Sequence, residues 1–377
     1  MECKEIQLSE VITDIAAGPF GSNLKVSCFV NEGFPIIDGA NLKGFKVTDN
    51  ITKFVTEEKA RSLHRSIAKR GDIIVTISGT LGQIAYIPDD SKYEEYLCSQ
   101  RQFRVTFDTT KVYVPYLVFY FHTYEGQHKI LSFANQVGVP ALSQPLKNFR
   151  QIAIQLPALE MQKKIANIVE LVNGKIEQNE SINNNLEQQA QALYSELFIE
   201  KSEPQWKIGY LSDLVEVKYG KDHKKLADGV YPVYGSGGIM RYVERPLYSG
   251  ESVLIPRKGT LNNVMYVNGA FWSVDTMFYT EMLRPNVAKF VFHFVKSKDL
   301  ASLNAGSAVP SMTTNILNAM QLRIPDEGTL QKFEELVSPM YKAMQENERQ
   351  SVNLSSIRDT LLPKLMSGEL DVSDIDL

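Results

Sequence analysis

The stretch GTLGQIAYI at residues 79–87 recurs, with changes, as GTLNNVMYV at residues 259–267. Gly, Thr, Leu and Tyr keep their spacing in both copies, and an apolar residue closes each one. The residues between them differ: Gly82–Gln83 in the first copy stands against Asn262–Asn263 in the second. A repeat with so long a period predicts that one structural unit occurs twice in the chain.

The repeat extends outward from this stretch in both directions. In the same order along the chain, LSEVI (8–12) matches LSDLV (211–215), RGDIIVT (70–76) matches SGESVLI (249–255), VPYLVFYF (114–121) matches VAKFVFHF (287–294), and IQLP (154–157) matches LRIP (322–325). Each copy is a globular part followed by a segment rich in Glu, Gln, Asn and Leu. We therefore expect four parts: 1–157, 158–200, 201–325 and 326–377.

Short β-branched runs bounded by Gly, Pro and Asp predict strands in the globular parts, and two apolar segments predict short helices. The expected class is mixed α+β. A chain of 377 residues with 44% hydrophobic residues fits two or three domains. It holds no apolar run of membrane-spanning length, so we expect no membrane partner. Its three cysteines form no CxxC pair, which favours reduced thiols and a cytoplasmic location over a zinc or disulfide framework.

Charge is distributed unevenly along the chain. The net formal charge of −4 divides into +1 for 1–157, −4 for 158–200, +5 for 201–325 and −6 for 326–377. Because the globular parts are neutral to basic, the acidic total does not exclude a nucleic-acid partner. A scaffold that contacts only proteins is an alternative, and the basic balance of 201–325 argues against it.

Apolar residues recur every three and four positions over five heptads in each of the two acidic segments. The a positions are Ile165, Val172, Asn179, Leu186 and Leu193 in the first segment, and Phe333, Met340, Asn347, Leu354 and Leu361 in the second. This pattern predicts two long helices that pack together. The segments superimpose with a constant offset of 168 residues, a whole number of heptads.

Both segments place Asn at the middle a position. A buried Asn costs stability but fixes register, because only a polar group satisfies it. If the helices pair antiparallel about their midpoints, Asn179 and Asn347 meet, and we hypothesise that they set the register. The alternative is that each Asn is partly solvated and the match is inherited from the duplication. A helix from Glu160 to Phe198 would be about 58 Å long, comparable to one to two turns of B-DNA at about 34–36 Å each.

Three features together resemble a known family. They are the loop AAGPFGSNLK (16–25), the two Gly-Thr-Leu phrases, and the run VGVPALSQPLKNFRQIAIQLPALEMQKKIANIVE (137–170) with its shorter echo at 309–337. The chain resembles the specificity subunit of type I restriction–modification enzymes over nearly its whole length. The most specific signal is LPALEMQKKI. The second copy, RIPDEGTLQKFEEL, lacks its Glu-x-Gln-Lys, so the resemblance does not imply that the two helical segments bind partner proteins equally strongly.

The resemblance implies a fold and a set of partners. The fold would be two similar α/β target recognition domains separated by two long antiparallel helices that form a coiled coil, with pseudo-two-fold symmetry. Each domain would read one half of a bipartite double-stranded DNA target, and the helices would set the unread gap. The helices would also bind two methyltransferase (modification) subunits, which restriction subunits join for cleavage. The methyltransferase would use S-adenosylmethionine, with no cofactor in this chain.

Candidate DNA contacts are polar or cationic residues on Gly-punctuated loops, since base edges need hydrogen-bonding side chains and phosphates need positive charge. They are Ser22, Lys25, Asn41, Lys43, Lys46, Ser78 and Arg101 in the first copy, and Lys221, Lys224, Lys225, Ser236, Arg241, Arg257, Lys258 and Asn262 in the second. For any one residue, a solvated surface side chain is the alternative. The recurring Gly79, Thr80, Gly259 and Thr260 are interpreted as turn architecture, and the differing residues beside them as the source of different specificities.

The sequence contains few of the motifs that would indicate a catalytic function. Asn-Pro-Pro-Tyr, Asp-Pro-Pro-Tyr, GxGxxG and GxxxxGK[ST] are all absent, so neither an adenine methyltransferase pocket nor a Gly-rich phosphate loop is predicted. Glu216-Val217-Lys218 matches a carboxylate-x-Lys nuclease triplet, but strand alternation also explains it. The chain is therefore expected to be non-catalytic, with a recognition subunit of a related enzyme that fuses nuclease and methylase as the nearer alternative.

Overall fold

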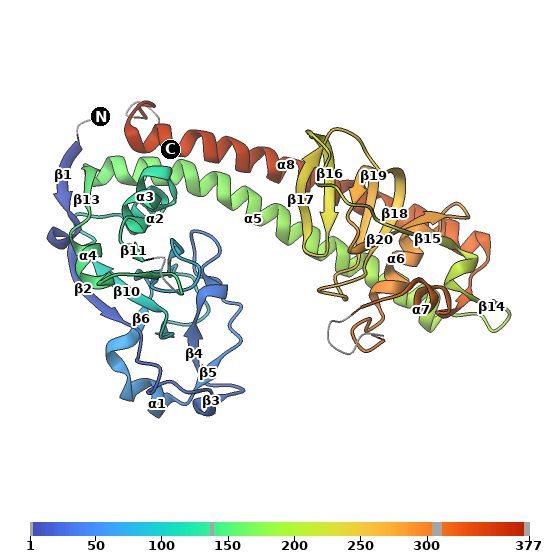
Figure 1. The fold of residues 1–377 in the computed structure, drawn as a ribbon, viewed down its shortest axis with the longest axis horizontal. Helices are drawn as coiled ribbons and strands as arrows, with labels where there is room; N and C mark the ends of the chain where they lie inside the picture. Colours follow the sequence, from blue (N-terminus) through green and yellow to red (C-terminus); the bar gives the residue numbers. More distant parts are fainter. Residues whose placement is uncertain (1–2, 136–138, 304–310, 373–377) are drawn as a thin grey trace. The chain divides into compact units, whose positions relative to one another are not determined.

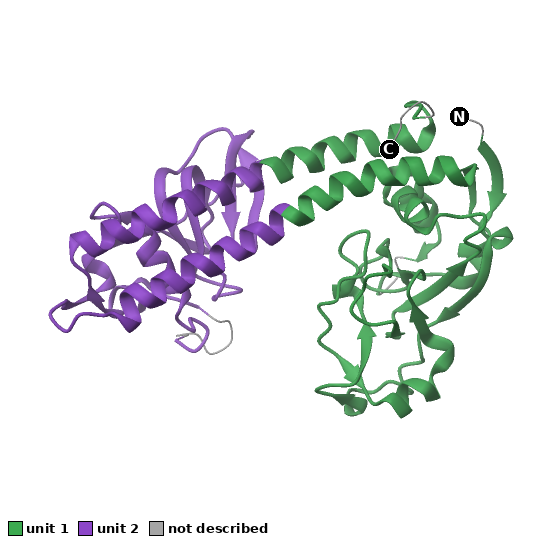
Figure 2. Cartoon of the chain, turned by 180° about the vertical axis from the view of Figure 1, so that it is seen from behind, with its two compact units in different colours: residues 1–178, 350–377 green, residues 179–349 purple. Residues whose placement is uncertain are grey.

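In the computed structural model, which describes residues 3–135, 139–303 and 311–372, the chain divides into two compact units. Unit 1 comprises 1–178 and 350–377, and unit 2 comprises 179–349 (Figure 2). Two long helices, α5 (Leu159–Ser195) and α8 (Glu327–Ser367), contribute residues to both units. The predicted mixture of sheets, short helices and two long helices is confirmed (Figure 1).

The described residues of unit 1 form four sheets with strand orders β1-β13, β2-β10-β7-β8, β3-β5-β4-β9-β6 and β11-β12. Its strands are β1 (Cys3–Gln7), β2 (Ile12–Ala17), β3 (Phe29–Val30), β4 (Phe34–Ile37), β5 (Phe54–Val55), β6 (Ile67–Lys69), β7 (Ile73–Thr76), β8 (Ile84–Tyr86), β9 (Glu95–Cys98), β10 (Gln102–Phe107), β11 (Ala134–Asn135), β12 (Ala141–Leu142) and β13 (Ala153–Pro157). Its shorter helices are η1 (Leu8–Glu10), η2 (Val26–Cys28), η3 (Gly39–Asn41), α1 (Glu57–Ser62), η4 (His64–Ser66), α2 (Val114–His122), α3 (Tyr124–Leu131) and α4 (Pro145–Arg150).

Unit 2 contains a six-stranded sheet, β15-β20-β18-β19-β16-β17, and the pair β14-β21. Its strands are β14 (Lys207–Tyr210), β15 (Val215–Tyr219), β16 (Asp228–Gly235), β17 (Gly238–Val243), β18 (Tyr248–Pro256), β19 (Met265–Ser273), β20 (Met277–Met282) and β21 (Gln321–Ile324). Its shorter helices are the π-helical turn η5 (Glu196–Glu200), η6 (Leu211–Asp213), α6 (Ala288–Lys296) and α7 (Thr314–Asn318).

The internal repeat is visible in the topology. In unit 1, β1 pairs antiparallel with β13, which leads into α5; in unit 2, β14 pairs antiparallel with β21, which leads into α8. A one-turn helix follows the first strand of each pair, and the next strand joins a sheet in the order β2-β10-β7 or β15-β20-β18. The apolar helices α2 and α6 occupy the two places that the sequence predicts.

The long helices are part of each core. In unit 1, Ile165 and Val169 of α5 and Leu365 of α8 lie in the same buried cluster as Val75 of β7 and Phe121 of α2. In unit 2, a second cluster combines residues from α5, α8, α6 and the sheet: Tyr194, Phe333, Phe290 and Val253. Because both ends of both helices share a core with a sheet, the compact units divide at the middle of each helix. The four-part division at 157, 200 and 325 is drawn from sequence composition and stays a prediction.

Candidate nucleic-acid interface

Both units place the repeated phrase in a similar pair of loops, which we call the loop frame. It comprises loops 77–83 and 99–101 in unit 1, and loops 257–264 and 274–276 in unit 2. Gly79 has φ 95° and Gly259 has φ 86°, a backbone region that favours glycine. In unit 1, the Ile77 N–H donates to the Arg101 carbonyl (2.7 Å), and in unit 2 the Arg257 N–H donates to the Thr276 carbonyl (2.9 Å). These bonds and the positive φ values confirm that the shared glycines serve the turn.

In each unit a further glycine, Gly18 or Gly220, allows the loop after β2 or β15 to pack closely against the loop frame. The Gly18 N–H donates to the Gln102 carbonyl (2.8 Å), and the Gly220 N–H donates to the Met277 carbonyl (3.0 Å). A Cβ at Gly18 would lie 1.9 Å from the Ser99 oxygen, and one at Gly220 would lie 2.0 Å from the Val274 oxygen. Only glycine permits such an approach. The loop after β2 therefore lies directly against the loop before β10 in unit 1, and the loop after β15 lies directly against the loop before β20 in unit 2.

In unit 1 this frame brings Ser78 and Arg101 together. Both residues line a cleft of about 600 Å³ and also a neighbouring hollow of about 770 Å³. Arg101 is exposed, and among the described residues its guanidinium has no hydrogen-bond or ion-pair partner. An unpaired guanidinium presents five N–H donors in a planar fork that matches guanine edges and phosphates. Ser22 and Lys25 are exposed on the adjoining loop.

Two other candidates of unit 1 have structural partners. Asn41 is 4% exposed; its amide donates to the carbonyls of Thr48 (3.4 Å) and Asn50 (3.2 Å), and its oxygen accepts the Asp38 N–H (3.0 Å). This burial corrects the expectation of a base-reading Asn41, because no free edge remains. Lys46 is half-buried and forms an ion pair with Glu177 of α5 (3.2 Å). Lys43 is exposed on the same loop.

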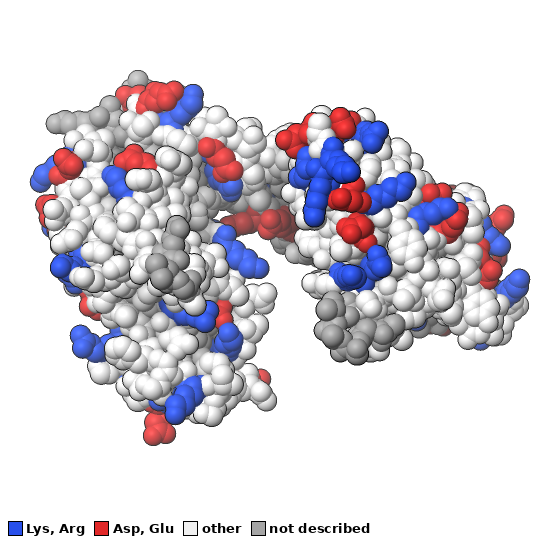
Figure 3. Space-filling view, in the orientation of Figure 1, with Lys and Arg blue, Asp and Glu red and all other residues white. Residues whose placement is uncertain are grey.

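In unit 2 the corresponding surface carries lysines. Lys221, Lys224 and Lys225 are exposed on the loop after Gly220, and Lys258 is exposed on the repeated turn. Arg257 instead donates to the Asp275 carbonyl (3.2 Å) and lies over the ring of Tyr219 (5.4 Å). On the face drawn in Figure 3, Lys and Arg among the described residues of each unit are interspersed with Asp and Glu. Net charge therefore does not single out a DNA-binding surface on this face, and the candidate surface is identified from the geometry of the loops.

Three further candidates of unit 2 also have internal contacts. Arg241 donates to Asp228 (2.8 Å) and to the Leu226 carbonyl (3.0 Å). Asn262 donates to Asp299 (3.1 Å) and accepts the Ala301 N–H (3.1 Å), while the Ser236 carbonyl accepts from Asn263 (2.7 Å). The differing residues at the repeated phrase therefore shape the loops. Gln83 does the same in unit 1, where it donates to the Gly39 carbonyl (3.0 Å).

The long helices pair antiparallel within each unit. In unit 2, Asn179 is 1% exposed and its Nδ2 donates to the Asn347 carbonyl (3.3 Å), so the two predicted asparagines meet. Asn347 in turn donates to Asn183 (2.8 Å), whose Nδ2 donates to the Met344 carbonyl (3.1 Å). In unit 1, Arg358 of α8 donates to the buried Asn173 of α5 (2.9 Å). Asn183 and Asn173 were missed because they lie outside the a positions.

Gln162, from the LPALEMQKKI stretch, ties α5 to unit 1. It is fully buried, accepts the Tyr113 N–H (2.8 Å) and donates to the carbonyls of Lys111 and Pro157 (2.9 Å each). The position 168 residues later is Leu330, which is buried in the core of unit 2. The missing Gln in the second copy thus reflects a different internal attachment of the helix.

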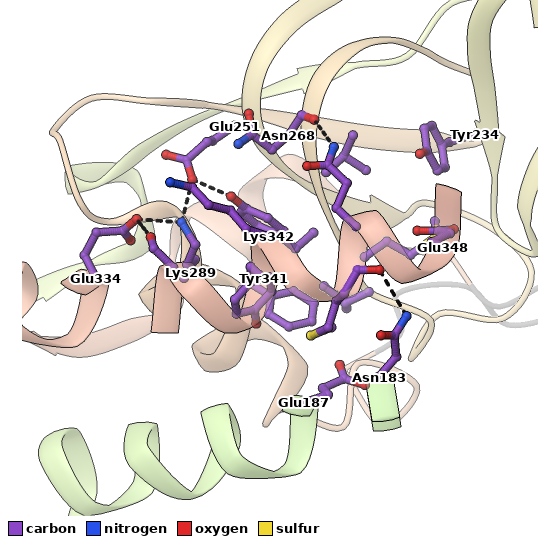
Figure 4. A pocket seen from close by; sticks show the side chains of 18 residues that line it. Asn183, Glu187, Tyr234, Glu251, Asn268, Lys289, Glu334, Tyr341, Lys342 and Glu348 are labelled. Atoms are coloured by element: carbon purple, nitrogen blue, oxygen red, sulfur yellow. Dashed lines mark hydrogen bonds and ion pairs between the residues drawn. The ribbon is translucent and has the colours of Figure 1, made fainter. Parts of the chain in front are cut away.

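Unit 2 attaches its helices through a buried lysine (Figure 4). The Lys289 ammonium, with 5% of its side chain exposed, contacts Glu251 of β18 (2.8 Å) and Glu334 of α8 (2.6 Å) beside a cavity of about 570 Å³. Burial acts to raise the pKa of Glu251, but hydrogen bonds from Lys289 and Tyr266 bring it below its ordinary value. Unit 1 uses neutral phenols instead: the Tyr86 and Tyr113 hydroxyls each donate to Glu170 (3.3 Å).

His293 of α6 bridges both long helices. Its Nδ1 lies 2.8 Å from Gln191 Oε1 of α5, and its Nε2 lies 2.9 Å from the Tyr341 hydroxyl of α8. Burial lowers the pKa of His293 to about 4. The side chain is therefore neutral at physiological pH and acts as a polar bridge in the core.

The nuclease triplet has a structural explanation. Lys218 donates to Glu216 two residues away on β15, and Glu216 faces Glu281 across the strand pair. Within 3–135, 139–303 and 311–372, no three His, Cys, Asp or Glu side chains are grouped to hold a metal ion. In the same ranges, none of the helices combines the length and apolar character needed to cross a bilayer.

These features define a duplicated protein with two similarly built units, and comparisons with known proteins identify its family. The type I restriction modification DNA specificity domain matches residues 21–188 and again 203–353. The chain therefore belongs to this family, as its sequence resemblance predicted. Its role as the DNA-specificity component rather than the catalytic one is thereby confirmed.

Individual relatives agree with this assignment. The specificity subunit of type I restriction enzyme MjaIX from Methanocaldococcus jannaschii is 22% identical over 365 residues, which cover 85% of this chain and 82% of the relative. The EcoprrI specificity subunit of Escherichia coli is 28% identical over 97 residues, covering 26% and 24%. The crystal structure of a type I restriction-modification S subunit from M. genitalium has the same fold, with a TM-score of 0.61, 16% identity, and coverage of 99% of this chain and 97% of that one.

Proposed function

We propose that unit 1 and unit 2 each read one half of a bipartite double-stranded DNA target. The observation that carries this proposal is that each unit presents an exposed cation at these loops: Arg101 on the loop before β10 in unit 1, and Lys258 on the repeated turn in unit 2. Side chains on a rigid loop can enter a groove and contact base edges, while the surrounding lysines contact phosphates. Ser22, Lys25, Lys43 and Ser78, and Lys221, Lys224 and Lys225, are the supporting candidates.

The long helices serve as spacer and docking surface in this proposal. Their lengths would set the unread gap between the half-sites. Apolar side chains that α5 and α8 leave exposed, among them Leu171 (64%), Val352 (55%) and Ile357 (50%), support docking of two methyltransferase (modification) subunits. Restriction subunits would join in the full complex. The methyltransferase would bring S-adenosylmethionine, and the complex would act on DNA in the cytoplasm.

Mapping methylated adenines in host DNA with and without this subunit tests the proposal. We expect one bipartite motif to lose methylation when the subunit is absent. A complementary binding assay measures affinity for that motif against salt concentration. Affinity should fall steeply with salt because phosphate contacts release counterions. Unchanged methylation, or binding insensitive to salt, would contradict a DNA-reading role.

A further inference from the structure

Phe20 is an aromatic side chain presented to solvent on the candidate interface. It lies in the loop between β2 and η2, and its side chain is 83% exposed. Val26 on the same loop is 81% exposed. Moving a large apolar group out of water lowers the free energy. The exposed ring of Phe20 therefore has apolar area that a partner bound at this surface can cover.

The loop holds this ring outward on a rigid backbone. The Gly18 N–H donates to the Gln102 carbonyl (2.8 Å), and the Asn23 N–H donates to the Phe20 carbonyl (2.8 Å), which closes a turn. A Cβ at Gly21 would lie 2.6 Å from the Gln100 side-chain oxygen, so this loop packs tightly against the loop before β10. The exposure of Phe20 is therefore built into the turn.

The neighbours of Phe20 are groups that can hydrogen-bond to bases. Phe20 lines the same hollow of about 770 Å³ as Asn23, Ser78, Gln100 and Arg101. Unit 2 has no Phe, Tyr or Trp on the equivalent loop after Gly220, where Lys221, Asp222 and His223 follow. DNA bases offer both flat apolar faces and hydrogen-bonding edges. An aromatic ring beside the exposed guanidinium of Arg101 matches both.

We propose that Phe20 is an apolar wedge that packs against bases of the half-site read by unit 1 and partly unstacks one base step. Apolar side chains of DNA-binding proteins insert between base steps in this way and favour steps that unstack easily. Arg101 then contacts an edge or phosphate beside the opened step. This inference rests on the proposed function and adds an apolar contact to the polar and cationic contacts proposed there.

The test uses the complex of this chain with its modification subunits and duplexes that carry the mapped target. The fluorescent base 2-aminopurine, which brightens when unstacked, is placed in turn at each position of the first half-site. The adenine to be methylated is left unlabelled because methyltransferases extrude it themselves. We expect wild-type complex to raise fluorescence at one step, and Phe20→Ala to remove that rise and weaken binding about tenfold. Phe20→Leu should keep part of both effects.

Tyr124→Ala is the matched control, since Tyr124 belongs to unit 1, is 86% exposed and lies outside the hollow. It should leave fluorescence and affinity unchanged. The wedge is overturned if Phe20→Ala keeps the fluorescence rise, or if it only prevents assembly with the modification subunits, which would make Phe20 a protein contact. Failure of the proposed function looks different: neither wild type nor variants would bind the target with salt dependence.

Discussion

At the residue scale, Arg101 is the side chain of unit 1 best placed to contact DNA, because it is exposed and unpaired within the described chain. We expect Arg101→Ala to weaken target binding by about 1–3 kcal/mol and to relax specificity in one half-site only. Lys4→Ala, an exposed cation on β1 outside this frame, is the control. The measurement is affinity for targets with each base pair substituted in turn. Equal losses at both half-sites would contradict the assignment.

His293 makes the stability of unit 2 depend on pH. Its pKa is about 4 in the folded chain and about 6.5 when unfolded. The folded state thus binds the proton more weakly, so the contribution is complete above about pH 6.5 and is lost as pH falls toward 4. Between about pH 7.5 and 5, wild type should lose about 2 kcal/mol more unfolding free energy than His293→Gln. Denaturant titrations at both pH values measure this, and parallel losses would refute it. Burial also lowers the pKa of His122, but His122 is present in both wild type and His293→Gln, so its contribution cancels in the comparison.

At the element scale, the helix pair was predictable and its attachments were not. The heptad pattern places all ten a positions where the structure has them at least half-buried, including Asn179 and Asn347. Gln162, Lys289 and His293 owe their roles to partners far away in sequence, which periodicity does not reveal. Asn41 was misjudged for a related reason. Its Gly-punctuated loop reads as exposed, but Asp38 and Asn41 cap a one-turn helix that folds inward.

The asparagine network should fix the register of the helix pair, since buried amides tolerate few alternative partners. We expect Asn179→Leu with Asn347→Leu to broaden the distance distribution between spin labels at Glu180→Cys and Glu346→Cys. These positions lie on α5 and α8 within unit 2. Asn185→Leu, an exposed asparagine of α5, should leave it narrow. A narrow, unshifted distribution in the double variant, with simple stabilisation, would show that the network is inherited packing without a register function.

At the scale of the whole molecule, the duplication connects sequence to proposed function. One frame was copied, and the two copies keep their glycines but differ in what they display: Phe20 and Arg101 in unit 1, and Lys221 and Lys258 in unit 2. The sequence alone reveals the repeat and the family. It does not reveal which polar loop residues are already satisfied internally, because Asn262, Arg241 and Gln83 find partners only in the folded chain.

If the helices set the gap between half-sites, lengthening both should lengthen the gap in phase with the DNA helix. Three heptads inserted after Gln178 in α5 and after Arg349 in α8 keep the a positions in register and add about 32 Å, close to one turn of B-DNA. We expect the methylated motif to keep both half-sites with a gap about nine to ten base pairs longer. A single-heptad insertion should abolish methylation instead, because about three added base pairs turn the second half-site away from unit 2. Selection from duplexes with randomised gaps measures both outcomes. An unchanged gap in the three-heptad variant would mean that the helices hold the modification subunits without measuring DNA.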